Sequence, residues 1–391
     1  MALNRTQVTV MLGIAQTLSW ASSYYLLAVL AKPIGQSTNT SYSLVFGAFS
    51  GALLVAAAAG PIAGRFIDRF GGRPVLIASN LGFACGLLIL SQATQTMHVF
   101  VAWAVMGLAM GSGLYEAAFA SVVHLYGQAA RPAITGITLF AGFASTVGWP
   151  LSSYLEGLYD WRFVCMFWAT LHLLLGLPLN ALLSRAKPNA EVVAEEQKPP
   201  EAVGSGGSIN LRRTAYLMAY VFAASWFIST AMASHLPQIL QASGATLATS
   251  ITAAALVGPA QVAGRVLEYS YLKKAHPLLS ARLAILAHPL AAICLGVAGA
   301  PAASVFSILH GLGNGILTIA IGTLPLKVFG SQGYGQRQGW LMVPARIGQA
   351  GSPFLFGLAV ANWGSQALWL SSLIALSAFA ALWSMRVSAQ Q

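Results

Sequence analysis

Charged side chains are scarce in this sequence: only 7% of its 391 residues are Asp, Glu, Lys or Arg. Soluble chains usually carry about 25% charged residues, and a soluble globule of this length could not cover its surface with so few. Hydrophobic residues make up 57% of the chain, and its mean hydropathy is +0.70. These values exclude a soluble enzyme, a disordered protein and a nucleic-acid-binding protein.

Sites that depend on cysteine or on soluble-enzyme motifs are also missing. The three cysteines, Cys85, Cys165 and Cys294, lie inside apolar runs without a CxxC or Cys/His ligand spacing. Neither disulfides nor a structural zinc are therefore expected. No GxxxxGK(S/T), GxSxG, HExxH or EF-hand pattern occurs, which argues against an ATP-driven pump and against an enzyme. We expect no metal and no cofactor.

Long apolar runs are what the sequence has in abundance. A transmembrane helix needs about 20 mostly apolar residues. Windows of that size predict twelve spans, roughly at 7–31, 43–64, 74–93, 98–122, 132–155, 162–184, 214–240, 247–268, 277–299, 302–326, 339–361 and 364–385. A polar break rich in Pro, Gly and Glu is typical of a flexible linker. The prediction is an N-terminal six-helix bundle over 1–184, a cytoplasmic linker over 185–213 and a C-terminal six-helix bundle over 214–391.

The 20 Lys and Arg residues are distributed unevenly between these spans. If the N-terminus is cytoplasmic, 17 of them fall on the cytoplasmic side, only Lys32 and Arg162 fall outside, and Arg346 lies within a span. Because cytoplasmic segments of membrane proteins carry an excess of Lys and Arg, both termini are predicted to be cytoplasmic. Membrane topology then explains the net charge of +11, and no nucleic-acid partner is needed.

A short pattern occurs twice, 200 residues apart. Residues 62–68 read Ile-Ala-Gly-Arg-Phe-Ile-Asp, and residues 262–268 read Val-Ala-Gly-Arg-Val-Leu-Glu. Both copies follow a Gly-Pro pair and lie at the cytoplasmic end of the second predicted span in their half. Together with the division of the spans into six and six, the pattern predicts two parallel six-helix repeats.

The segment after the second predicted span carries a more specific motif. Residues 64–73 read Gly-Arg-Phe-Ile-Asp-Arg-Phe-Gly-Gly-Arg. This resembles the G-x-x-x-D-R-x-G-x-R motif that lies between the second and third spans of the major facilitator superfamily. The resemblance implies an all-α integral membrane protein, whose twelve transmembrane helices form two six-helix pseudo-repeats with both termini cytoplasmic.

The resemblance also implies a role for the charged residues of the motif. Asp68 would face the N-terminus of the eleventh helix, where an anion is favoured, and with Arg69 and Arg73 it would latch the cytoplasmic side shut. The alternative is a solvated basic turn that only sets topology.

Two charged residues lie well inside the predicted spans, where each costs about 2.5–3.5 kcal/mol at a helix centre. Glu116 is in the fourth span and Arg346 in the eleventh, each about eight residues from the cytoplasmic end. Three interpretations remain open. Glu116 could be the carboxylate that couples transport to protons, Arg346 could bind a substrate carboxylate, or the two could form a structural ion pair.

Polar and aromatic side chains mark the spans that line the central cavity in the resembled family. Gln16, Trp20 and Tyr24 recur every four residues on the first span, and His310 and Asn314 are one turn apart on the tenth. Such a stripe can hold an organic solute by ring contacts and hydrogen bonds, although ordinary helix packing explains it equally well. The candidate substrate-binding residues are Gln16, Trp20, Tyr24, Tyr115, Trp226, His310, Asn314 and Arg346.

These features together predict a multi-pass secondary active transporter in the cell (cytoplasmic or inner) membrane, acting as a monomer by alternating access. The hypothesis is proton-coupled movement of a small organic solute, with a lean toward an organic anion such as a monocarboxylate. The alternative is a proton-driven efflux pump for multiple drugs or toxic compounds, in which Glu116 binds a cation. Its expected partners are the solute, a coupling ion and the lipid bilayer.

Overall fold

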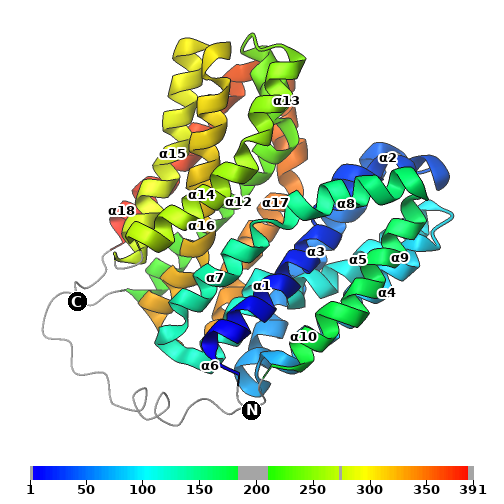
Figure 1. Cartoon of the computed structure of the whole chain (residues 1–391). Coiled ribbons are helices and arrows are strands. Elements are labelled where there is room, and N and C mark those ends of the chain that lie inside the picture. Colours follow the sequence, from blue (N-terminus) through cyan, green and yellow to red (C-terminus); the bar gives the residue numbers. More distant parts are fainter. Residues whose placement is uncertain (1–2, 184–209, 273–274, 386–391) are drawn as a thin grey trace, which may run out of the picture. The chain divides into compact units, whose positions relative to one another are not determined.

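The computed structural model describes residues 3–183, 210–272 and 275–385, and within these ranges every regular element is a helix (Figure 1). Nine of the described helical stretches are long and apolar enough to cross a membrane. Two of them, Thr96–Leu158 and Tyr334–Ser384, contain 63 and 51 residues, far more than the ~20 that one crossing needs. The all-helical membrane architecture agrees with the sequence prediction. The count of twelve spans and the side on which the termini lie stay predictions.

Contacts among the described residues divide the protein into two compact units. The first unit contains the described residues up to 183 together with Gly330–Trp340, and the second contains those from 210 to Phe329 and from Leu341 onward. Gly330–Trp340 therefore packs with the first unit, although in sequence it lies within the predicted C-terminal bundle over 214–391. The predicted linker over 185–213 lies mostly outside the described residues, and its last three residues belong to the helix that begins at Leu211.

The helices of the first unit follow one another through short connections, and several are interrupted. In chain order they are α1 (Arg5–Ser22), α2 (Leu27–Ser37), α3 (Tyr42–Phe70), α4 (Gly72–Ser91), α5 (Thr96–Gly113), α6 (Tyr115–Tyr126), η1 (Gly127–Ala130), α7 (Arg131–Ala141), α8 (Ala144–Leu158), α9 (Trp161–Leu171), η2 (His172–Gly176) and α10 (Leu177–Ala181).

The helices of the second unit are longer on average. They are α12 (Leu211–Ala242), α13 (Leu247–Ala255), α14 (Val257–Leu267), η3 (Glu268–Leu272), α15 (Pro277–Ala298), η4 (Ala300–Ala302), α16 (Ala303–Phe329), α17 (Tyr334–Trp363), η5 (Gly364–Gln366) and α18 (Ala367–Ser384). The first turns of α17 belong to the first unit and its remainder to the second.

Polar side chains cap the starts of several helices. Asn4 accepts from the Gln7 amide at 2.8 Å, while Gln7 reaches back to the Asn4 amide at 3.0 Å, which is a capping box at the start of α1. Asp160 caps α9 by accepting from the Phe163 amide at 2.7 Å. These bonds satisfy amide groups that have no partner inside the helix, so they define where each span begins.

Close helix contacts through glycines occur in both units. In the first unit, Gly107 and Gly111 place α5 directly against the backbone of α3. In the second, Gly311 and Gly315 place α16 directly against the backbone of α14. A Cβ atom at any of these glycines would collide with a carbonyl oxygen of the facing helix, so only glycine allows this separation. The same small-residue spacing at corresponding places agrees with the internal repeat found in the sequence.

Interruptions within helices shape the regions that matter for function. Between α5 and α6, Leu114 is extended, with φ −84° and ψ −164°. Between α1 and α2 the chain leaves the α-helical pattern for four residues, and a π-helical turn separates α9 from α10. The predicted spans over 7–31, 98–122 and 162–184 are therefore not continuous α-helices, because local backbone rearrangements interrupt them.

Candidate functional site

A buried glutamine joins α1 to the break between α5 and α6. The amides of Ala117 and Ala118 bond to the Leu114 carbonyl, so the Gly113 carbonyl is left outside the helical ladder. Gln16 Nε2 donates to that carbonyl at 2.6 Å, and the side chain is only 1% exposed. Gln16 Oε1 is buried without a hydrogen-bond partner among the residues that the structure describes. It is therefore an acceptor available to a bound molecule.

An aromatic cluster lies beside this glutamine. The Trp20 ring centroid is 5.4 Å from that of Tyr24 and 4.9 Å from that of Tyr115. Tyr115 also stacks on Phe119 at 5.2 Å, and Tyr24 meets the edge of Phe49 at 5.4 Å. The structure thus brings together three of the aromatic residues that the sequence singled out, in the first unit and next to the helix break.

Glu116 is the second residue of α6 and is half-buried. The amide groups of the first helical turn and the helix dipole favour a negative side chain there. The carboxylate also interacts electrostatically with Tyr334, at the start of α17 in the same unit. The break after Gly113 thus creates a helix start within a long apolar stretch and places an acid at that start.

Asp68 at the end of α3 contacts the start of α17. Its Oδ1 accepts from the Gly335 amide and its Oδ2 from the Gln336 amide, both at 2.8 Å. The predicted meeting of Asp68 with the N-terminus of this helix is therefore present in the structure. Its role as a gate stays a prediction.

The two arginines of the same motif make no comparable contact with α17. Arg69 lies over the ring of Phe70, with its Cζ 5.1 Å from the centroid. Arg73 follows the turn at Gly71, where φ is +80° and glycine is favoured, and it is partly exposed at the start of α4. The gating role predicted for Arg69 and Arg73 therefore stays a prediction.

The second unit holds Arg346 on α17 in a buried polar setting. Arg346 is 3% exposed, and its Nη1 donates to Gln349 Oε1 at 2.9 Å. Its Cζ lies 5.7 Å from the centroid of Trp226 on α12. Gln349 Nε2 in turn donates to Thr230 Oγ1 at 3.4 Å. The predicted residues Arg346 and Trp226 therefore meet.

The sequence reasoning missed Gln349 and Thr230. Each lies about one turn from a residue that was singled out: Gln349 is three residues after Arg346, and Thr230 is four after Trp226. The i+3 and i+4 spacing is the signal that would have found them.

His310 and Asn314 lie one turn apart on α16 but have different partners. Asn314 Nδ2 donates to Ser229 Oγ on α12 at 3.0 Å. His310 Nδ1 lies 3.1 Å from Nδ1 of His288 on α15. The sequence predicted a shared substrate-facing surface for His310 and Asn314, which stays a prediction. The contact between His310 and His288 joins α15 and α16, and the sequence analysis missed it.

The predicted pairing of Glu116 with Arg346 also stays a prediction. The two residues belong to different units, Glu116 to the first and Arg346 to the second. Within residues 3–183, 210–272 and 275–385, no group of three or more His, Cys, Asp and Glu side chains is arranged to hold a metal ion.

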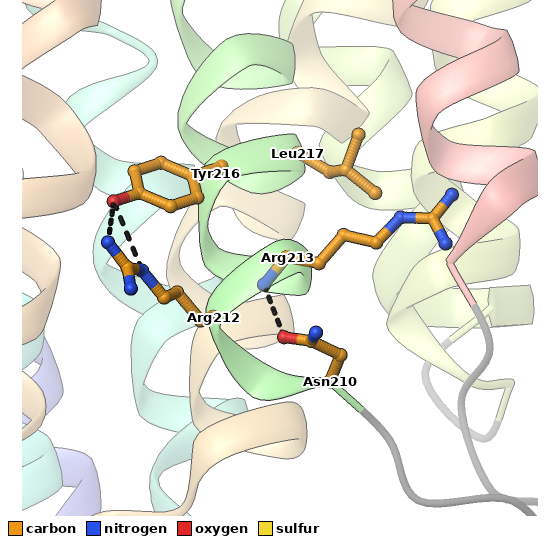
Figure 2. A pocket seen from close by; sticks show the side chains of 5 residues that line it. All are labelled: Asn210, Arg212, Arg213, Tyr216 and Leu217. Atoms are coloured by element: carbon orange, nitrogen blue, oxygen red, sulfur yellow. Dashed lines mark hydrogen bonds between the residues drawn. The ribbon is translucent and has the colours of Figure 1, made fainter.

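A separate pocket opens at the start of α12. Figure 2 shows Arg212 reaching the Tyr216 hydroxyl, with both Nε and Nη2 at 3.4 Å, and the Asn210 side chain capping the helix through the Arg213 amide at 3.0 Å. The pocket is basic and exposed, and Leu217 completes its lining. None of the predicted site residues lines it.

Comparison with known proteins places these features in a family context. The family model described as Major Facilitator Superfamily matches residues 12–307. Among curated proteins, Monocarboxylate transporter 2 of Homo sapiens is 26% identical over 139 residues, covering 35% of this chain and 28% of that protein. The match thus spans less than a third of the relative's length.

Solved structures share the fold over almost the whole chain. The proton:xylose symporter XylE, bound to 6-bromo-6-deoxy-D-glucose, has a TM-score of 0.75 and 12% identity, covering 97% of this chain and 95% of that one. The human organic anion transporter MFSD10 (TETRAN) has a TM-score of 0.70 and 16% identity, covering 97% of this chain and 100% of that one. At these identities the likeness concerns the fold alone.

Proposed function

Because the chain belongs to the Major Facilitator Superfamily, whose family model matches residues 12–307, we propose that it is a secondary active transporter for a small organic anion of the monocarboxylate class. It is a multi-pass membrane protein, and its family and relatives point to a transporter rather than an enzyme. Beyond membership of this family, we propose the class of substrate, coupling of transport to a proton, and transport by alternating access.

Arg346 is the observation that carries this proposal. A charged group deep in a membrane protein is costly and commonly marks a substrate or ion pathway. Gln349 accepts from its Nη1, and the Trp226 ring lies against its guanidinium, so two neighbours fix the orientation of the planar group. A fixed guanidinium fork suits a carboxylate, which it can bind through two parallel hydrogen bonds.

The neighbours of Arg346 favour a small anion with an apolar remainder. The Trp226 ring offers an apolar face next to the guanidinium, against which a short hydrocarbon chain can pack. One of the curated relatives is named Monocarboxylate transporter 2, a name that fits a substrate with one carboxylate.

Proton coupling is proposed for Glu116 in the first unit. The carboxylate occupies the first turn of α6, directly after the break that Gln16 stabilises. The partial positive charge of a helix start attracts a carboxylate, so loss or gain of a proton at Glu116 would alter how firmly this turn is held. Asp68 would hold α3 to the start of α17 as a cytoplasmic latch, and the transporter would act as a monomer in the cell membrane with both termini cytoplasmic.

The aromatic cluster supports a second candidate function. Trp20, Tyr24 and Tyr115 offer clustered ring faces, and Glu116 directly follows Tyr115 in α6, a combination that suits a lipophilic cation. In that case the protein would be a proton-driven efflux pump for drugs or toxic compounds.

Charge movement in proteoliposomes on a solid-supported membrane distinguishes the two functions. We would present lactate and acetate, then a lipophilic cation such as tetraphenylphosphonium, at two pH values, to the wild type and to Arg346→Lys. The lysine keeps the charge but loses the bidentate fork, so we expect the lactate concentration for half-maximal current to rise about tenfold or more. Currents evoked by the cation alone, unchanged in Arg346→Lys, would support efflux instead.

Arg282→Lys is the matched control. Arg282 is also an arginine of the second unit stacked on a tryptophan, with its Cζ 5.0 Å from the Trp383 ring, but it donates to the Leu382 and Trp383 carbonyls. We expect lactate currents in this variant to match those of the wild type. Equal losses in both variants would contradict a specific role of Arg346.

A further inference from the structure

Two histidines and a serine form a buried chain across α15, α16 and α18. The two Nδ1 atoms of His288 and His310 are 3.1 Å apart, and His288 Nε2 lies 2.9 Å from Ser371 Oγ. Ser371 Oγ is also 2.9 Å from the Leu368 carbonyl. The exposed fractions are 6% for His288, 5% for His310 and 0% for Ser371. Buried rings at such distances are held by hydrogen bonds, so the placement of their protons is constrained.

The chain of contacts allows two neutral proton arrangements. In one, Ser371 donates to the Leu368 carbonyl and accepts from His288 Nε2, so the bare His288 Nδ1 accepts from His310 Nδ1–H. In the other, Ser371 donates to His288 Nε2, His288 Nδ1–H donates to His310 Nδ1, and the proton of His310 is on Nε2. Each neutral imidazole has one donor and one acceptor, so the Ser371–His288 and His288–His310 bonds run in opposite directions in the two arrangements, and only the first keeps the Ser371 bond to the Leu368 carbonyl.

His310 Nε2 is where a further proton can enter. Both ring nitrogens of His288 have partners, whereas His310 Nε2 has none among the residues that the structure describes. A proton added to Nε2 in the first arrangement breaks no hydrogen bond, because His310 Nδ1–H still donates to His288. The Phe306 ring is stacked on His310, with centroids 6.0 Å apart and planes at 17°, and its face can stabilise the resulting positive charge.

Few other titratable groups lie on the elements packed around this pair. The helices α13 and α18 carry no titratable side chain. On α15 and α16 the others are Arg282, Cys294 and Lys327. Those on α12 and α14 are Arg212, Arg213, Tyr216, Tyr220, His235 and Arg265. Arg282, the arginine closest in sequence to His288, donates to the Leu382 carbonyl at 2.9 Å. Glu268 in η3 is the only carboxylate in the described part of the second unit.

We propose that the His288–His310 pair is a proton-binding site of the second unit, with His310 Nε2 as the atom that takes up and releases the proton during transport. The proton adds to the lone pair of Nε2 from the aqueous side that is open, and it leaves from the same atom when the opposite side opens. This proposal rests on the proposed function, because it assumes that movement of the proton is coupled to transport of the solute. Histidine is the side chain that changes charge most readily near neutral pH, which suits a unit whose described residues include a single carboxylate.

His172 in the first unit provides the contrast. Its Nε2 lies 2.7 Å from Ser22 Oγ and its Nδ1 lies 2.9 Å from Asn80 Oδ1, and the ring is 0% exposed. Both nitrogens therefore have hydrogen-bond partners, whereas His310 Nε2 has none among the described residues. His172 is also a buried histidine held between helices, which makes it the matched control.

The experiment compares His310→Asn with His172→Asn in proteoliposomes. Asparagine at 310 can keep the hydrogen bond to His288 Nδ1 but offers no basic nitrogen. For each variant, lactate accumulation under a pH gradient is compared with its own lactate exchange without a gradient. Relative to that exchange, we expect His310→Asn to lose the accumulation of about tenfold per pH unit that coupling to one proton allows. His172→Asn should retain both activities, and full accumulation by His310→Asn would overturn the proposal.

A second measurement needs no solute. Nitrogen-15 spectra of histidine-labelled protein, recorded against pH, report protonation of each ring. Comparison with His310→Asn and His172→Asn assigns the signals. We expect His310 Nε2 to gain a proton reversibly in the folded protein and His172 to keep its state. No protonation of His310 would overturn the proposal even if lactate is transported. If the wild type transports no lactate but His310 titrates, the substrate class fails and the proton site stands.

Discussion

At the scale of single residues, the Gln16 side chain holds the broken fourth span together. The extended Leu114 leaves the Gly113 carbonyl without its helical donor, and Gln16 Nε2 replaces that donor at 2.6 Å. No water reaches a carbonyl in the apolar core of a membrane protein, so a missing donor cannot be replaced by solvent. One residue on α1 therefore decides whether Tyr115 and Glu116 stay in place.

The variant Gln16→Leu tests this. Leucine fills much of the same volume but cannot donate, so the Gly113 carbonyl loses its partner. We expect the free energy of unfolding to fall by about 1–3 kcal/mol, the cost of leaving a buried polar group unsatisfied. This fall in the free energy of unfolding is measured from the shift of the thermal unfolding midpoint in detergent, with and without denaturant.

Ser19→Ala serves as the control for this variant. Ser19 is also buried on α1, at 4% exposure, but its hydroxyl donates to the Ala15 carbonyl of its own helix at 2.9 Å. That carbonyl keeps its helical partner in the variant, so a change within about 0.5 kcal/mol is expected. If Ser19→Ala lowers the free energy of unfolding as much as Gln16→Leu does, the hydrogen bond between Gln16 and the Gly113 carbonyl does not explain the loss of stability.

At the scale of helices, Asp68 joins the end of α3 to the start of α17. One carboxylate accepts from two successive amides at 2.8 Å, and its negative charge faces the positive end of the helix dipole. The close backbone contact between Gly64 and Gly335 brings the two elements near enough for these bonds. The Asp68 carboxylate therefore helps to hold the start of α17 against the end of α3.

We expect Asp68→Asn to loosen the start of α17. An asparagine has one acceptor oxygen, so one of the two amides loses its partner, and the charge is lost as well. Hydrogen exchange measured by mass spectrometry over residues 330–340 should become about tenfold faster, which corresponds to about 1.4 kcal/mol.

Asp160→Asn provides the comparison for Asp68→Asn. Asp160 caps α9 through a single bond to the Phe163 amide, and asparagine caps helices about as well as aspartate. Exchange around Phe163 should therefore stay unchanged. Unchanged exchange over 330–340 in Asp68→Asn would mean that the two bonds do not control the start of α17.

The sequence contained enough information for the helices and for part of the site. Apolar runs located the helices, since a span must satisfy its backbone hydrogen bonds internally. The four-residue spacing of Gln16, Trp20 and Tyr24 placed them on one face, and the motif around Asp68 indicated its contact with a helix start. The apolar runs and the four-residue spacing are local signals, so they could be found in one sequence without any knowledge of packing, whereas the helix that Asp68 contacts was implied by the resemblance to the family.

The features that the sequence did not predict depend on contacts between distant segments. The break at Leu114 has no proline, and it persists because Gln16 in the first span, 97 residues before Gly113, donates to the Gly113 carbonyl. His288 and His310 meet only because α15 and α16 pack with a particular rotation. Gly330–Trp340 packs with the first unit, which chain order alone does not indicate.

At the scale of the whole molecule, the two units share a helical scaffold but differ in chemistry. The first unit has carboxylates at helix starts, Glu116 on α6 and Asp68 facing α17. The second has a buried arginine and a histidine pair, and Glu268 is the only acid among its described residues. The two units are therefore alike in being helical but differ in their charged side chains, and the proposed anion-binding arginine and histidine proton site both lie in the second unit.

The membrane topology is also a prediction about the whole molecule. It follows from the 17 Lys and Arg residues that lie on the cytoplasmic side if the N-terminus is cytoplasmic. Alkaline phosphatase is active only outside the cytoplasm, whereas green fluorescent protein fluoresces when it folds inside. We expect phosphatase joined after Gly299, between the ninth and tenth predicted spans, to be active. After Gly330, or at the C-terminus, it should be inactive, and fluorescent fusions there should be bright.

The fusions also test the number of spans. Two cytoplasmic termini require an even number of crossings, and the described stretches Thr96–Leu158 and Tyr334–Ser384 are each long enough to cross twice. Phosphatase joined after Asn362, at the end of α17, should therefore be active, because the chain would be outside before α18 returns it. An inactive fusion at that position, together with an active one at the C-terminus, would reverse the orientation and contradict the charge distribution as its determinant.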